Sequence, residues 1–297
     1  MTSYNEVLGI IYLNLMALGI LGNSFLLYLY GQESITGRRT RPINTIVIHM
    51  AFSNSMLILS GGVPKIMQVW VLKSFLGCNE VKIINYLMRA ARGLSLCSSC
   101  LLSVSQAITI SPYSPMWAGL KARAPKCTLP CCLLCWVLNL LIAVFVPIYV
   151  TCPRNSSKER WNIWSSSLNL HAINTLKIAI WKSVYDGVFV GFMVITSSYM
   201  VLILYRHRQR VQYIHRTNMS PRASPETRAT KAILLLMLLF VCFTSISSPF
   251  SVHMLYSEET KYWVINGIII LSLCYPAVSP FILISSDTQI TWTCHGF

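Results

Sequence analysis

The sequence predicts an all-α membrane protein, a bundle of seven transmembrane helices, and three observations lead to this fold class. Of the 297 residues, 54% are hydrophobic and only 11% are charged, whereas a soluble domain carries about 25% charged residues. Seven long apolar segments follow one another along the chain, and Lys and Arg concentrate in alternate connections between them. No linker rich in Gly, Ser or Pro divides the chain, so we predict a single domain over residues 1–297.

The apolar segments are long enough to cross a bilayer as helices. A hydrocarbon core of about 30 Å requires about 20 residues in a helix, and only a helix satisfies its backbone polar groups within one segment. The predicted spans are approximately 7–30, 43–69, 80–110, 128–150, 174–205, 230–256 and 262–285.

Each span has its own signature. The first follows no basic segment and is too long for the core of a signal peptide, so we predict an uncleaved first helix. The second carries Lys65 near one end, where a long side chain can reach the lipid headgroups. The third and fifth contain several charges, and the fourth, sixth and seventh contain almost none. Pro249 in the sixth span, and Pro276 with Pro280 in the seventh, suit either moving kinks or static bends.

Basic residues set the predicted orientation. Thirteen Lys and Arg fall in the first, third and fifth connections, against six in the connections on the other side. The positive side faces the cytoplasm, which puts Met1 outside and Phe297 inside. The formal net charge of +15 would indicate nucleic-acid binding in a soluble protein. Here the charge is a topology signal, so the expected partner is the lipid bilayer and not a nucleic acid.

Two features belong to the predicted outer side. Asn155 lies in a sequon in the loop after the fourth span and is a candidate glycosylation site, whereas the sequon at Asn218 lies in a basic inner loop and is interpreted as chance. Cys78 and Cys152 are both on the oxidising side, where disulfides persist. A Cys78–Cys152 bridge and two free thiols are both compatible with these positions.

Other cysteines have the spacing of half a zinc site. Cys97-x-x-Cys100 and Cys132-x-x-Cys135 occur inside apolar helices, with no polar groups in sight that would orient them as metal ligands. We therefore predict small buried thiols and no metal site.

Charged residues inside spans are costly in lipid and usually face a partner or a cavity. Arg89 and Arg92 lie 11 and 14 residues past Cys78, which is roughly 16 and 21 Å into the membrane, and Asp186 lies at a comparable depth. One interpretation is a structural ion pair between Asp186 and either arginine, with Lys182 as a competing partner. The other is that an arginine binds an anionic or carbonyl group of a ligand through its forked donors. Arg89, Arg92 and Asp186 are therefore candidate ligand-binding residues.

Gly187 and Gly191 give the fifth span a face of small residues. Such a face can form a dimer contact, but we expect close packing against another helix of the same bundle.

Enzymatic signatures are absent from the sequence. It contains no His-Glu-x-x-His, no Gly-x-Ser-x-Gly, no P-loop and no dinucleotide fingerprint, so we expect neither catalysis nor a cofactor. A transporter or channel is the alternative, but it predicts repeated halves or helices interrupted at matched positions, and neither is visible. A membrane-embedded hydrolase would need paired polar catalytic residues, which we do not find.

An ordered set of strings runs from the third span to the seventh. The third span contains Arg89-Ala-Ala-Arg92-Gly93-Leu94-Ser95, then Cys100-Leu-Leu-Ser-Val-Ser-Gln106-Ala-Ile-Thr-Ile-Ser111-Pro112. The further strings are Trp117-x-x-Leu120-Lys121-x-x-Ala-Pro125, Cys135-Trp136, Tyr205-Arg-His207-Arg-x-Arg-Val-Gln, Ser220-Pro-Arg-Ala-Ser-Pro-Glu226-x-Arg-Ala-Thr230 and Tyr275-Pro-x-x-Ser-Pro280-Phe. In this set the chain resembles the vomeronasal type-1 receptors, a family of pheromone receptors with seven helices.

The resemblance implies a rhodopsin-like bundle in the plasma membrane of sensory neurons. It implies that a small pheromone or odorant binds from outside. From the buried charges and the helix-breaking prolines, we expect it to enter between the third, fifth, sixth and seventh helices. The resemblance also implies that the inner side engages a heterotrimeric G protein of the inhibitory class, and the candidate contact residues are Gln106, Lys121, Arg206, His207, Arg208, Arg210 and Arg228.

The chain departs from the family pattern in two places. The family usually carries a Tyr-Cys pair before the fifth helix, where this chain has Ile163-Trp164. The family's partner for Cys78 is therefore missing, unless Cys152 replaces it. Ser105 stands where the family has Phe before Gln106.

Overall fold

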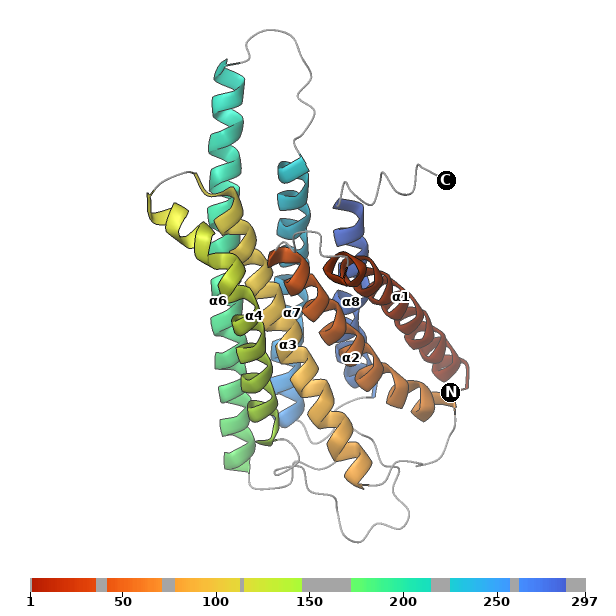
Figure 1. Cartoon of the computed structure of the whole chain (residues 1–297). Helices are drawn as coiled ribbons and strands as arrows, with labels where there is room; N and C mark the ends of the chain where they lie inside the picture. Colours follow the sequence, from red (N-terminus) through yellow and green to blue (C-terminus); the bar gives the residue numbers. More distant parts are fainter. Residues whose placement is uncertain are drawn as a thin grey trace, which may run out of the picture.

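The fold is a bundle of long α-helices (Figure 1). A computed structural model describes residues 2–35, 42–70, 78–112, 115–145, 172–214, 225–256 and 262–286. Its helices are α1 (Thr2–Ile35), α2 (Pro42–Trp70), α3 (Cys78–Ile110), α4 (Pro115–Ala143), α6 (Ala172–Ile214), α7 (Pro225–Tyr256) and α8 (Tyr262–Ser286). Within these ranges there is no strand, which confirms the all-α class.

Six of the helices are long and apolar enough to cross a membrane. In α7 the apolar stretch found among the described residues, Thr230–Ile246, is shorter. The predicted spans correspond in order to the helices of the structure, one span to each.

The bounds of α4 differ most from the prediction. The helix begins at Pro115 and not at residue 128, and it ends at Ala143, while residues 146–150 lie outside the described ranges. Lys121 and Arg123 therefore lie on a helix, not in a loop as predicted. Hydropathy marks only the part of a helix that lies in hydrocarbon, and a helix can continue where its charged side chains reach headgroups and water.

The same reason explains the longer helices at the basic connection. α6 continues to Ile214, beyond the predicted end at residue 205, and α7 begins at Pro225, before the predicted start at residue 230. The basic residues of this connection from Arg206 to Arg210, together with Arg228, belong to helices.

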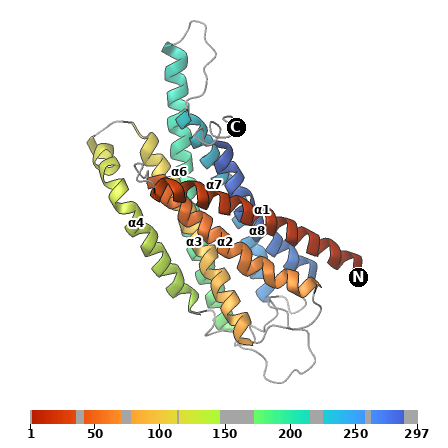
Figure 2. The ribbon, with the colours of Figure 1, turned by 45° about the vertical axis from the view of Figure 1, so that its right-hand side comes forward.

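α3 is the central helix. It packs against α2, α4, α6 and α7, while α1 packs against α2 and α8. Figures 1 and 2 both place α4 on one side of α3 and α1 on the other. Residues on α3 can therefore contact most of the bundle, which is why its polar side chains organise the interior.

The outward surface of α4 and α6 is apolar. Leu134, Val137 and Leu141 of α4 are exposed, as are Phe192 and Ile195 of α6. In water such a surface would be an aggregation-prone patch, but in lipid it costs nothing. The arrangement is that of a membrane bundle, with apolar side chains outside and polar ones inside.

The buried interior holds a series of polar side chains. Residues without any exposure include Asn23, Ser53, Asn54, Ser99 and Ser103. Because water is absent from the hydrocarbon region, these groups must bind one another or backbone carbonyls.

Prolines in α8 are accommodated by a contact from α1. Pro280 has no N–H, so the carbonyl of Pro276 loses its intrahelical donor. Asn23 Nδ2 donates to this carbonyl at 2.9 Å and also to Gly19 O of its own helix at 2.7 Å. The helix therefore continues through both prolines to Ser286.

Glycines show which helices approach closely. A Cβ at Gly93 would overlap the amide of Asn139, so α3 and α4 need glycine there. No described atom lies within 4 Å of a Cβ at Gly187 or Gly191. The expectation that these two glycines pack against another helix of the bundle is therefore wrong, because this face of α6 points away from its neighbours.

Candidate functional site

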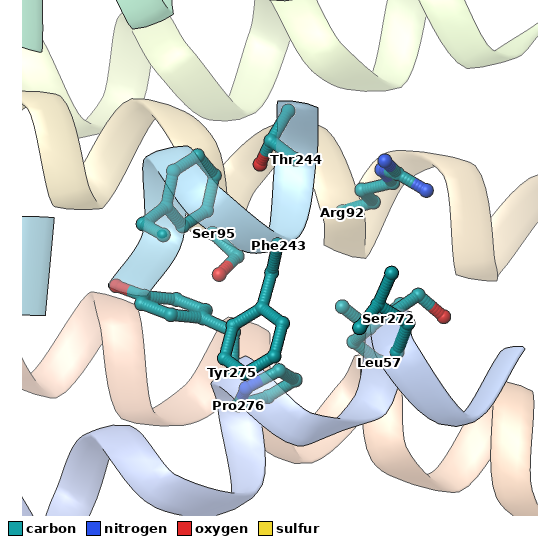
Figure 3. A pocket seen from close by; sticks show the side chains of 10 residues that line it. Leu57, Arg92, Ser95, Phe243, Thr244, Ser272, Tyr275 and Pro276 are labelled. Atoms are coloured by element: carbon teal, nitrogen blue, oxygen red, sulfur yellow. The ribbon is translucent and has the colours of Figure 1, made fainter. Parts of the chain in front are cut away.

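A small cavity lies between α2, α3, α7 and α8. Its volume is about 30 Å³, which is room for about one water molecule. Figure 3 shows the lining side chains converging from the four helices. They include Leu57, Arg92, Ser95, Phe243, Thr244, Ser272 and Tyr275. The lining helices correspond to the second, third, sixth and seventh predicted spans.

One wall of the cavity is fixed by hydrogen bonds between α2, α3 and α8. Ser95 Oγ donates to Asn54 Oδ1 at 2.7 Å, and Asn54 Nδ2 donates to Ser279 Oγ at 3.0 Å. One turn further along α3, the hydroxyls of Ser99 and Tyr275 are 2.6 Å apart. These bonds hold the three helices together and leave the cavity's other wall to α7.

The predicted charged residues lie close together. Arg89, Arg92 and Asp186 are all half-buried, and Arg89 is near enough to Asp186 and Arg92 to interact electrostatically with both. Arg92 also lines the cavity. Asp186 Oδ2 is buried and accepts no hydrogen bond from any residue that the structure describes. The three side chains thus bring strong donors and an unused acceptor into one region of α3 and α6.

The buried thiols lie where α3, α4 and α6 meet. Asn139 Nδ2 donates to Cys97 Sγ at 3.3 Å, and Tyr185 OH donates to Asn139 Oδ1 at 2.9 Å. Cys97, Cys100 and Cys132 are buried and free. This contact is structural, joining the central helix to two outer helices.

Lys65 is a polar residue whose place the sequence interpretation missed. It is 2% exposed, so the expectation that it reaches the headgroups is wrong. The side chain points into the bundle and donates to Gln68 Oε1 at 3.1 Å. One signal was available. Lys65 lies eleven residues after the buried Asn54, about three turns, so both lie on the same helix face.

Of the predicted G-protein contacts, the structure describes the side chains of Gln106, Lys121 and Arg206. Gln106 is buried and its Nε2 donates to Thr230 Oγ1 of α7 at 2.9 Å. Lys121 Nζ donates to the carbonyl of Ser111 at 2.8 Å, and Arg206 is exposed. The remaining predicted contacts have side chains outside the described set, namely His207, Arg208, Arg210 and Arg228.

The predicted features of the outer loop lie outside the described residues. Cys152 and Asn155 are both in the undescribed stretch 146–171, and Cys78 begins α3 without a described side chain. The disulfide and the glycosylation site remain predictions.

The match to a known family covers almost the whole chain. The model of the vomeronasal organ pheromone receptor family matches residues 7–296. The chain belongs to this family. Vomeronasal type-1 receptor 4 of Pongo pygmaeus is 39% identical over 284 residues, 94% of each chain. Human vomeronasal type-1 receptor 3 is 37% identical over 98% of this chain and 94% of its own length.

The chain is also similar to an olfactory receptor of Danio rerio. Olfactory receptor class A-like protein 1 of Danio rerio is 32% identical over 95% of this chain and 90% of its own length. As a vomeronasal-type receptor, the chain is a multi-pass membrane protein, as at the plasma membrane of sensory neurons, and its family is not an enzyme class. The resemblance found in the sequence strings is confirmed.

Proposed function

We propose that this vomeronasal-type receptor binds a small pheromone or odorant from the extracellular side and activates a heterotrimeric G protein of the inhibitory class. The observation that carries the proposal is the family match over residues 7–296, in a chain whose interior collects charged side chains at one depth.

Arg89, Arg92 and Asp186 are the proposed ligand contacts. An ionisable residue inside a membrane bundle usually marks a functional site, and Asp186 Oδ2 has no donor among the described residues. A guanidinium can bind a carbonyl or an anionic group through two parallel hydrogen bonds. A ligand held between α3 and α6 would favour one packing of the bundle over another.

The test of this function is a ligand panel applied to cells that express the receptor. The readout is dissociation of inhibitory-class and stimulatory-class G proteins, measured separately. We expect a ligand to activate the inhibitory class, and Arg89→Ala to weaken its potency by at least tenfold, because a hydrogen bond to a charged group contributes about 1.5–3 kcal/mol.

Lys82→Ala is the matched control, since Lys82 is also a cation on α3 but lies nearer the start of the helix. Unchanged potency in Arg89→Ala would remove Arg89 from the site. Activation of the stimulatory class alone would refute the proposed coupling.

A further inference from the structure

Lys65 is a buried cation with few partners. Its side chain is 2% exposed, and its one hydrogen bond within the described part of the chain goes to the neutral amide of Gln68. An ammonium group has three N–H donors. Burying a charge without an opposite charge is costly, and removing such a cost is a source of binding free energy.

Among the buried and half-buried charged residues that the structure describes, cations outnumber acids. Lys65 of α2 is buried, and Arg89 and Arg92 of α3 are half-buried cations, whereas Asp186 is a half-buried acid of α6. Asp186 interacts with Arg89, and no described acid forms an ion pair with Lys65. The interior is therefore suited to an additional negative charge at Lys65.

Lys65 lies on the side of the cavity that is predicted to face outside. Leu57, Gly61 and Lys65 follow at intervals of four residues, so they lie on nearly the same face. Leu57 lines the cavity, and a Cβ at Gly61 would contact Leu273 of α8 and Met88 of α3 at 3.3 and 3.7 Å. Lys65 is two turns, about 12 Å, from Leu57, toward the end of the bundle predicted to face outside.

The residue after Lys65 packs against an apolar cluster. An apolar cluster of Leu8, Tyr12, Ile269 and Leu273 forms between α1 and α8, and Ile66, the next residue along α2, packs against it. An occupant of this region would therefore present hydrocarbon to the cluster and one polar end to the ammonium.

We propose that Lys65 binds the anionic group of the receptor's ligand, and that this ligand is an apolar molecule with a single carboxylate or similar anionic end. The proposal rests on the ligand-binding function proposed above and specifies its chemical class. The anion pairs with the Lys65 ammonium, and the apolar body lies against the cluster that Ile66 contacts. An anionic lipid headgroup has the same chemistry, so the experiment separates the two sources.

The experiment measures binding without any G protein. Full-length receptor is placed in nanodiscs of phosphatidylcholine alone, and its thermal unfolding midpoint is followed against octanoate or methyl octanoate, which share one hydrocarbon chain and differ in charge. We expect octanoate to raise the midpoint of the native receptor and methyl octanoate to have little effect. Lys65→Met should weaken the apparent octanoate affinity at least tenfold, and Lys82→Met should not change it.

Three results would overturn the proposal. One is absence of stabilisation by octanoate, and another is equal stabilisation of the native receptor and Lys65→Met. The third is stabilisation by added phosphatidylglycerol but not by octanoate, which would assign the ammonium to a lipid headgroup.

The variant itself controls for a structural role of Lys65. Met fills a similar volume without a buried charge, so Lys65→Met without probe should be at least as stable as the native receptor. A marked fall in its midpoint would show that the ammonium holds the bundle together, and would also overturn the proposal. Since no coupling is measured here, failure of this test leaves the Arg89 experiment to decide the proposed function separately.

Discussion

Pro280 leaves the carbonyl of Pro276 without an intrahelical N–H donor. Asn23 of α1 donates to it at 2.9 Å, beside a longer contact of 3.5 Å from Ser279 Oγ of α8. In a membrane the freed carbonyl cannot turn to water, so the amide of a neighbouring helix takes the place of the missing N–H. The same residue therefore permits a proline break in α8 and joins α1 to it.

Replacing this amide should destabilise the bundle. We expect Asn23→Leu to lower the stability by about 1 kcal/mol, the order found for hydrogen bonds between membrane helices, which is a midpoint shift of about 2–4 °C. Asn14→Leu is the control, because Asn14 is exposed and donates to Ile10 O of its own helix. Thermal unfolding of the purified receptor checks both, and equal midpoints for the two variants would contradict the role of Asn23.

Some residues of the interior could be foreseen from the sequence and others could not. Arg89 and Asp186 were recognised because a charged residue within an apolar segment is conspicuous, whichever way its side chain points. Lys65 was misjudged because hydropathy gives a residue's depth along a helix but not the direction in which its side chain points. The spacing between Lys65 and Asn54 indicates the direction of the Lys65 side chain, but this spacing is informative only once Asn54 is known to face inward.

Among the helices, α3 approaches α4 closely at one glycine. Gly93 allows the Asn139 amide of α4 to lie against the backbone of α3, and this amide also accepts from Tyr185 OH of α6. Three helices therefore meet at a position where one residue must have no side chain.

A methyl group at this position tests the contact. Gly93→Ala should lower the unfolding midpoint, because Asn139 must move and release its bond to Tyr185. Gly191→Ala should be neutral or stabilising by about 0.5–1 kcal/mol, since alanine is the better helix former and Gly191 has open space around it. Stabilisation of both variants would show that α3 and α4 can separate without cost.

At the same scale, helix existence was predictable and helix length was not. The order of the spans follows from long apolar runs, which only helices can carry through lipid. The start of α4 at Pro115 could not be recognised, because Lys121 and Arg123 resemble a loop in a hydropathy profile, although charged residues outside the hydrocarbon do not end a helix.

For the molecule as a whole, the bond between Gln106 and Thr230 ties α3 to α7 at the end predicted to face the cytoplasm. Gln106 was predicted from the family resemblance as a G-protein contact, yet it is 3% exposed. A partner could reach it only after α3 and α7 separate, so the bond favours the packing seen here.

Removing the bond should raise signalling without ligand. We expect Thr230→Val to increase basal G-protein activation about fivefold per receptor at the surface, the population change that corresponds to about 1 kcal/mol. Thr109→Val is the control, because Thr109 donates to Ser105 O within α3. Basal activity that stays at the native level in Thr230→Val would show that this bond does not separate the two packings.

The length of α6 has a mechanical consequence. Its 43 residues span about 65 Å, roughly twice the hydrocarbon thickness, and its apolar part ends at Arg206. The eight residues that follow, to Ile214, form a rigid rod of about 12 Å that continues from the membrane helix without a hinge. Tilting the membrane part of α6 by a few degrees would therefore swing the tip of this rod sideways, so that a small rearrangement around Asp186 is magnified at the far end.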